Sequence, residues 1–263
     1  MSKGAFKALI YVIKEIFAMI KGLLFDKDGT IIDFFSIWPV VAREVIPKFL
    51  RQIEIYDDGT IERELLESMG LHDDKVNPKG AFAYKSYGEI AEDICSVLTD
   101  HDVFIELYSI YVQIKDLFNN TMKNTTPVYK TFADMPDLLR GLKNEGYFIG
   151  LTTADVQESA ERCLNELNII EYFDYIGADD GTRKPKPNGE MIDEFKAITG
   201  LKADEIAVVG DTFNDMLFGK QNGCSAIGVL SGVSGKEDFD DMADDIIDSV
   251  ADIRKALDKL NAE

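Results

Sequence analysis

Two aspartates separated by one residue, Asp26 and Asp28, follow the apolar run Gly22–Phe25, and Gly29 comes directly after them. Carboxylates at this spacing can divide the work of phosphoryl transfer. One attacks phosphorus, while its neighbour gives a proton to the leaving oxygen and later takes one from water. Gly29 lets the backbone turn sharply after the strand. The pattern predicts a nucleophile and an acid-base group at a strand end.

Two further Asp-Gly-Thr segments act as internal controls for this interpretation. Residues 57–60 and 179–182 both read Asp-Asp-Gly-Thr, but Tyr56 and Ala178 stand where the earlier aspartate would be. Neither segment follows an apolar strand of the right kind. An acidic turn explains these two segments, whereas the strand with both aspartates favours chemistry at residues 26–30.

A second apolar run, Phe148–Leu151, leads into Thr152, Thr153, Ala154 and Asp155. A hydroxyl and the backbone amides of a strand-to-helix turn can hold phosphoryl oxygens. Taken alone, the same residues could form an ordinary helix N-cap.

A cationic segment, residues 183–187, reads Arg-Lys-Pro-Lys-Pro in an otherwise acidic chain. Two prolines restrict the loop, and a lysine held there can neutralise charge on a transferring phosphoryl group. Solvated lysines on a rigid turn are the alternative.

A fourth strand end carries Asp211 and Asp215 after the apolar residues Val208 and Val209. Hard oxygen ligands, with room for water and phosphate, suit Mg²⁺. The alternative is that Asp211 or Thr212 only caps the following helix.

These strand ends belong to a regular alternation of strands and helices. Short apolar runs separated by amphipathic stretches predict an α/β fold, with a Rossmann-like parallel sheet covered on both faces. The expected strands are Gly22–Phe25, Phe148–Leu151, Tyr175–Gly177, Ile206–Val209 and Ala226–Val229, and the expected helices are Val156–Leu167, Gly189–Thr199 and Asn214–Gln221. Polar residues at the carboxyl ends of such strands form the site in open parallel sheets.

The chain between the first two strands differs from the rest in the spacing of its hydrophobic residues. It is mostly helical in period, which predicts a helical cap at residues 36–127 inserted into a core formed by residues 21–35 and 128–263. Asn119–Pro127 is the expected return linker. Residues 1–20 are expected to form a helical extension whose apolar face docks on a partner or on the body. A membrane span is not expected, because Lys14 and Glu15 interrupt the apolar stretch.

In their order along the chain, the four strand ends resemble the motifs of the haloacid dehalogenase superfamily, and most closely its phosphoglycolate phosphatase-like members with an inserted helical cap. The resemblance covers the core from about Lys21 to the end of the chain. It implies a Mg²⁺-dependent phosphatase that acts on a phosphoglycolate-like phosphate monoester through an aspartyl-phosphate.

The same resemblance assigns roles to individual residues. It implies that Asp26 is the nucleophile and Asp28 the general acid and base. The implied phosphate-binding residues are Gly29, Thr153, the backbone at Ala154, and Lys184, with Lys186 as the second choice for the lysine. The implied metal ligands are Asp26, the backbone carbonyl of Asp28, Asp211 and Asp215. Four converging carboxylates would repel one another without a cation, which agrees with a metal site.

Composition limits the partners. The net charge of -20 disfavours nucleic acid, so the expected partner is a small phosphate ester received by local cations. Three scattered cysteines indicate reduced thiols and a cytoplasmic protein, and no membrane association is expected. The sequence leaves both a monomer and a homodimer open.

Other functions are weighed against this one. No cysteine has Arg six residues later, both histidines lie in the predicted cap, and no P-loop motif is present, which argues against other phosphatase chemistries. Two alternatives stay open: a sugar-phosphate mutase of the same superfamily, and a non-enzymatic binding module.

Overall fold

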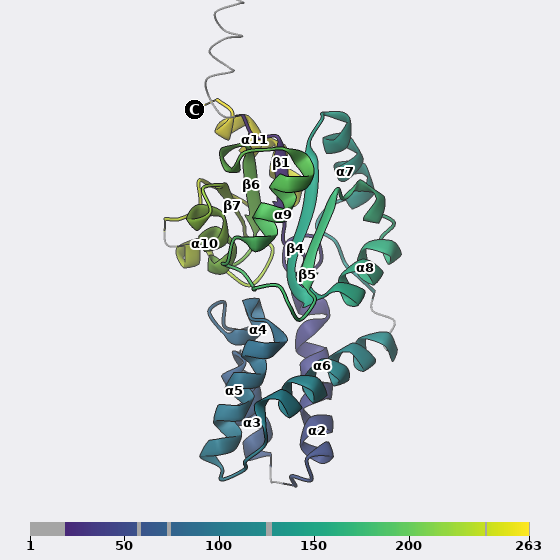
Figure 1. Cartoon of the computed structure of the whole chain (residues 1–263), viewed down its shortest axis with the longest axis vertical. Helices are drawn as coiled ribbons and strands as arrows, with labels where there is room; N and C mark the ends of the chain where they lie inside the picture. Colours follow the sequence, from purple (N-terminus) through teal and green to yellow (C-terminus); the bar gives the residue numbers. More distant parts are fainter. Residues whose placement is uncertain (1–18, 57–58, 73–74, 125–127, 240, 263) are drawn as a thin grey trace, which may run out of the picture.

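The computed structural model describes residues 19–56, 59–72, 75–124, 128–239 and 241–262 (Figure 1). Its main feature is a six-stranded sheet in the order β5-β4-β1-β6-β7-β8, in which every pair of neighbours is parallel. The strands are β1 (Gly22–Phe25), β4 (Phe148–Val156), β5 (Tyr175–Asp179), β6 (Ile206–Gly210), β7 (Ser225–Val229) and β8 (Asp245–Ile247). The predicted parallel α/β sheet is confirmed.

Both faces of the sheet are buried, which explains why its central strands are apolar throughout. All residues of β1 and β6 are buried. On one face Leu24 belongs to a buried cluster with Phe195 and Phe218, which lie on the helices α9 (Glu190–Thr199) and α10 (Phe213–Gln221). On the other face Leu23 and Phe25 belong to the main buried cluster. That cluster includes residues of α7 (Met135–Asn144), α8 (Gln157–Glu166) and α11 (Ile253–Leu260).

The strand order places the catalytic candidates next to one another. β1 pairs with β4 on one side and with β6 on the other, so three of the four predicted strand ends meet at the same edge of the sheet. This is the position at which the strand order reverses, where open α/β sheets bind their ligands.

Five helices, called the inserted helices below, lie between β1 and α7 in the chain and form the part of Figure 1 opposite α11. They are α2 (Trp38–Gln52), α3 (Thr60–Ser68), α4 (Ala81–Tyr84), α5 (Tyr87–Asp100) and α6 (Leu107–Asn124), accompanied by a small hairpin of β2 (Leu71–His72) and β3 (Lys75–Val76). Short 3₁₀ helices complete the chain at Phe34–Ser36, Ile170–Tyr172, Ala203–Glu205, Lys236–Phe239 and Val250–Asp252. The predicted helical character of this interval is confirmed.

The expected linker Asn119–Pro127 differs from the structure, because α6 continues to Asn124. Thr121 and Met122 are buried, each with 3% of its surface exposed, so packing holds these polar-rich turns in the helix. Residues 125–127 and the expected N-terminal extension up to residue 18 lie outside the described residues. Within the described chain, no helix is long and apolar enough to span a membrane.

Candidate active site

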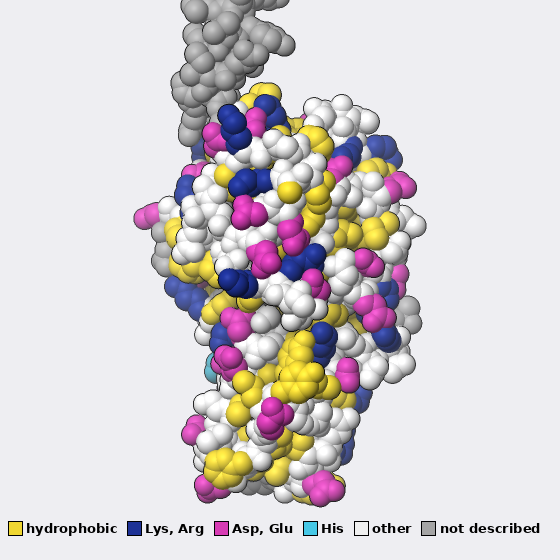
Figure 2. Space-filling model, in the orientation of Figure 1, with side chains coloured by type: hydrophobic (Ala, Val, Ile, Leu, Met, Phe, Trp, Pro, Cys, Tyr) yellow, Lys and Arg dark blue, Asp and Glu magenta, His cyan; other side chains and the backbone are white. Residues whose placement is uncertain are grey.

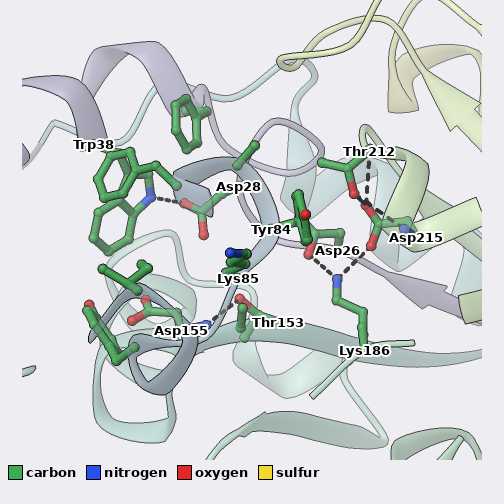
Figure 3. Close-up of a pocket in the computed structure, with 16 residues that line it drawn as sticks. Asp26, Asp28, Trp38, Tyr84, Lys85, Thr153, Asp155, Lys186, Thr212 and Asp215 are labelled. Carbon is green, nitrogen blue, oxygen red and sulfur yellow. Dashed lines mark hydrogen bonds and ion pairs between the residues drawn. The ribbon is translucent and has the colours of Figure 1, made fainter. Parts of the chain in front are cut away.

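Lys186 bridges two aspartates that follow different strands of the sheet (Figure 3). Its Nζ lies 2.7 Å from Asp26 Oδ1, after β1, and 2.6 Å from Asp215 Oδ1, at the start of α10. It also donates to the carbonyl oxygen of Thr152, at 3.2 Å. Lys186 is only 8% exposed, so the ammonium group is held among buried acceptors.

The structure therefore places Lys186, and not the preferred sequence candidate Lys184, against Asp26. The side chain of Lys184 is exposed, and its backbone N–H donates to Glu190 Oε2 at 3.0 Å. The loop is held by two amide side chains: Asn214 Nδ2 donates to the carbonyl of Lys186, and Asn222 Nδ2 to that of Pro187, both at 3.2 Å. These contacts determine which lysine faces the site.

Burial and neighbouring charges change the pKa of both Asp26 and Lys186. Burial raises the pKa of Asp26 to about 7, although Lys186 opposes the change. Burial disfavours the ammonium of Lys186, but Asp215 and Asp26 outweigh that effect and raise its pKa above the usual value. The lysine therefore stays charged and favours the ionised, nucleophilic form of Asp26.

Asp28 is held by two side chains whose roles the sequence did not indicate. Its Oδ2 lies 2.7 Å from Lys27 Nζ, and its Oδ1 accepts a hydrogen bond from Trp38 Nε1. Lys27 is 1% exposed and also pairs with Asp155 Oδ2 at 3.1 Å. Burial raises the pKa of Asp28 and Lys27 opposes this.

Thr153 and Ala154 lie at the end of β4 and line the same cavity as Asp26. Thr153 is 3% exposed, and its Oγ1 accepts a hydrogen bond from the backbone N–H of Asp155 at 3.1 Å. The pairing of β4 with β5 shifts register between Thr152 and Val156, so the strand becomes irregular where these residues stand. This irregularity is compatible with a backbone cradle for an anion.

The acidic pair at the end of β6 is deeply buried. Asp211 and Asp215 are each 1% exposed, and Asp215 Oδ2 accepts hydrogen bonds from the N–H and hydroxyl of Thr212, at 3.1 and 2.5 Å. Asp211 Oδ2 accepts from the N–H of Val233 at 2.9 Å, while its buried Oδ1 has no hydrogen-bond partner among the described residues. Burial, followed by repulsion from Asp26 and Asp215, raises the pKa of Asp211 well above its usual value.

Gly29 brings the first strand end close to this acidic pair. Its φ is +84°, and a Cβ built there would lie 2.3 Å from Asp211 Oδ2. Only glycine fits both the backbone conformation and the close approach. Gly29 therefore packs the loop that carries Asp28 against Asp211.

The donor set is chemically suited to a hard cation. Asp26, Asp211 and Asp215 are buried carboxylates, burial and repulsion from the other two raise the pKa of Asp211, and Asp211 Oδ1 is an unsatisfied acceptor among the described residues. Over the described part of the chain, no group of three or more His, Cys, Asp or Glu side chains is close enough to hold a metal ion as arranged. Lys186 occupies the position between Asp26 and Asp215 in this arrangement.

A cavity opens in front of these groups, with about 580 Å³ of empty space including its mouth. Its lining joins the strand ends to the inserted helices, as Figure 3 shows for Asp26, Lys186, Trp38 and Lys85. A substrate bound there would touch both parts of the molecule.

Residues 23–229 match the family model described as haloacid dehalogenase-like hydrolase. The chain belongs to this family, and the sequence-based recognition of it is confirmed, as is the expectation of an enzyme.

Similar proteins carry several different names. A pyrophosphatase PpaX of Bacillus cereus is 25% identical over 249 residues, covering 92% of this chain and 98% of the relative. A crystal structure of a predicted phosphoglycolate phosphatase from Haemophilus somnus has a TM-score of 0.66 at 18% identity and covers 90% of this chain and 97% of that one. A β-phosphoglucomutase from Clostridium difficile has a TM-score of 0.64 at 18% identity, with 93% and 100% covered. The two structures share the fold.

Proposed function

We propose that this hydrolase is a magnesium-dependent phosphatase, which cleaves phosphate monoesters of small molecules through an aspartyl-phosphate formed on Asp26. One observation carries the proposal: Lys186 bridges Asp26 and Asp215 at the edge of the sheet, with Asp28 beside them in the same cavity. A buried nucleophile, a cation and an acid-base group thus face one bound molecule.

The reaction follows from the roles that these groups can take. The Asp26 carboxylate attacks phosphorus, and Lys186 offsets negative charge on the phosphoryl oxygens. Asp28 gives its proton to the leaving oxygen in the first step. It then takes a proton from the water that hydrolyses the aspartyl-phosphate.

Magnesium is the proposed cofactor, with Asp26, Asp211, Asp215 and the backbone carbonyl of Asp28 as its ligands. When bound, it would neutralise the carboxylates and orient a phosphoryl oxygen toward the nucleophile. The unsatisfied oxygen of Asp211 supports this assignment. Thr153 and the backbone at Gly29 and Ala154 are the proposed phosphate contacts.

The proposal also covers domain organisation, cellular location, partners and oligomeric state. We infer a core of residues 21–35 and 128–263 with a cap at 36–127, and a cytoplasmic enzyme that acts on small molecules without nucleic acid or membrane, as a monomer or homodimer. Cys95, Cys163 and Cys224 are all free thiols, which supports a reducing compartment.

The test is release of inorganic phosphate from a panel of small phosphate esters, with and without Mg²⁺, for the native chain and Asp26→Asn. We expect Mg²⁺-dependent release that Asp26→Asn abolishes. Asp180→Asn is the matched control, because Asp180 belongs to the exposed Asp-Gly-Thr turn, and it should retain release. No release from any ester by folded native protein would refute the proposal.

A sugar-phosphate mutase is the second candidate, since a β-phosphoglucomutase shares the fold. A mutase would return the phosphoryl group to a sugar phosphate and convert it to an isomer with little free phosphate. The same panel, analysed for isomers, separates the two. Phosphoglycolate and pyrophosphate belong in it, since phosphoglycolate follows from the sequence resemblance and pyrophosphate from the name of a relative.

A further inference from the structure

Aromatic side chains from the inserted helices and from the 3₁₀ helix Phe34–Ser36 cover the side of the active-site cavity that faces Asp28. We call this region the aromatic chamber, and it is lined by Phe34, Trp38, Phe82, Tyr84, Tyr87 and Ile90. Its rings contact one another edge to face, with centroids 5.9 Å apart for Phe34 and Phe82 and 6.1 Å apart for Trp38 and Phe82. Such packing makes a firm apolar wall.

The charges in this cavity are already compensated. Lys85 Nζ donates to both carboxylate oxygens of Asp93, at 3.0 and 2.8 Å, and Lys186 is held between two aspartates. Lys85 and Lys186 are the cationic side chains among the described residues that line it. The acidic residues that line it are Asp26, Asp28, Asp155 and Asp215. After one phosphate is bound beside Lys186, the described lining offers a second anionic group only carboxylates and Lys85, whose charge Asp93 already balances.

The chemistry of the first step places the leaving group in this chamber. Asp28 must reach the leaving oxygen to protonate it. Asp28 accepts a hydrogen bond from Trp38, a wall residue of the chamber, so the organic part of the ester lies beside the aromatic rings. A neighbouring cavity shares Thr153, Ala154 and Lys186 but is not lined by Asp28, so it lies away from the leaving group.

Resting on the proposed phosphatase function, we infer that the substrate is a phosphate monoester of a small, flat, uncharged alcohol of aromatic character. Phosphoglycolate carries a carboxylate, and pyrophosphate a second phosphate, on the side of the molecule for which the chamber offers apolar walls and aspartates. Both are therefore poor substrates for this site.

The experiment compares kcat/KM, with Mg²⁺, for benzyl phosphate, ethyl phosphate, phosphoglycolate and pyrophosphate. The alcohols that leave from the three esters have similar acidity, so differences among those esters report recognition. We expect benzyl phosphate to exceed ethyl phosphate by about tenfold or more, since burying a few additional carbons in an apolar pocket gives that much discrimination. Phosphoglycolate and pyrophosphate should fall below ethyl phosphate.

Two variants test whether the chamber causes the preference. Phe82→Leu keeps an apolar side chain but removes the ring, and should lower the benzyl-to-ethyl ratio by about two- to tenfold. Phe104→Leu is the control, because Phe104 is 77% exposed and does not line the cavity, and its ratio should equal that of the native chain.

The outcomes separate this inference from the proposed function. Mg²⁺-dependent hydrolysis with phosphoglycolate or pyrophosphate preferred would overturn the aromatic specificity and leave the phosphatase intact. An unchanged ratio in folded Phe82→Leu would also overturn it. Absence of hydrolysis of every compound would remove the phosphatase and the inference together.

Discussion

Replacing Lys186 by Met tests the ion-pair bridge at the centre of the proposed site. The change removes the ammonium that lies 2.7 Å from Asp26 and 2.6 Å from Asp215, and it leaves two buried carboxylates unpaired. Breaking a buried ion pair in this way costs about 3–5 kcal/mol of folding free energy. At about 2–4 °C per kcal/mol for a chain of this size, the midpoint of thermal unfolding without Mg²⁺ should fall by about 6–20 °C. The loss of charge neutralisation should lower kcat by about 10²–10³-fold.

The matched control for this variant is Lys184→Met, two residues away in the same loop. Because the Lys184 side chain is exposed, its replacement should change folding stability by less than about 0.5 kcal/mol and leave kcat near the native value. Differential scanning calorimetry compares the unfolding midpoints of the two variants. Phosphate release is compared at a temperature below both midpoints. If Lys184→Met lost activity while Lys186→Met retained it, the assignment of the lysine would be refuted.

Three further predictions follow from the packing and charges of the site. Lys27→Met should lower turnover of ethyl phosphate by about tenfold or more but lower turnover of p-nitrophenyl phosphate less. The reason is that a good leaving group needs less protonation by Asp28, which Lys27 positions. Equal losses for the two substrates would contradict this role. Gly29→Ala should abolish activity, because the added Cβ would lie 2.3 Å from the Asp211 carboxylate. Gly59→Ala is the control, because Gly59 also has a positive φ, +92°, but open space around the added Cβ. It should lower the free energy of unfolding by about 1–2 kcal/mol and keep activity. Because the folded pKa of Asp26 is raised from 3.8 to about 7, the folded metal-free chain binds more protons than the unfolded one between these values, so its stability should decrease as pH rises through this range. Unfolding curves should show a smaller decrease with Asp26→Asn or with Mg²⁺; an increase with pH would contradict the raised pKa.

The fold could be predicted from the sequence where burial is complete. Central strands such as Ile206–Gly210 are buried along their whole length, and their continuous apolar runs therefore identify them. The edge strand Asp245–Ile247 was not predicted, because it is short and only Ile247 is buried. Asn119–Asn124 has the composition of a loop, but Thr121 and Met122 pack inward in α6, so tertiary burial overrides local propensity there.

Site residues that directly follow strands could be predicted from the sequence, whereas contacts that depend on loop conformation could not. Asp26, Asp211 and Asp215 follow directly from strand positions, since neighbouring parallel strands end at one edge. The contacts of Lys27 and Trp38 with Asp28 could not be predicted, because they depend on how the chain turns after β1 and on where α2 begins.

The choice between Lys184 and Lys186 shows most clearly what a sequence can leave undetermined. Both lysines precede a proline in one short loop, so composition and local backbone restriction treat them alike. The difference comes from Asn214 and Asn222, whose amides bind the carbonyls of Lys186 and Pro187 from α10 and from its C-cap. α10 also carries Asp215, which receives the lysine. Because one helix both orients the loop and supplies an acceptor, the position of the cation is determined by tertiary contacts across about 30 residues of sequence, which no local motif can encode.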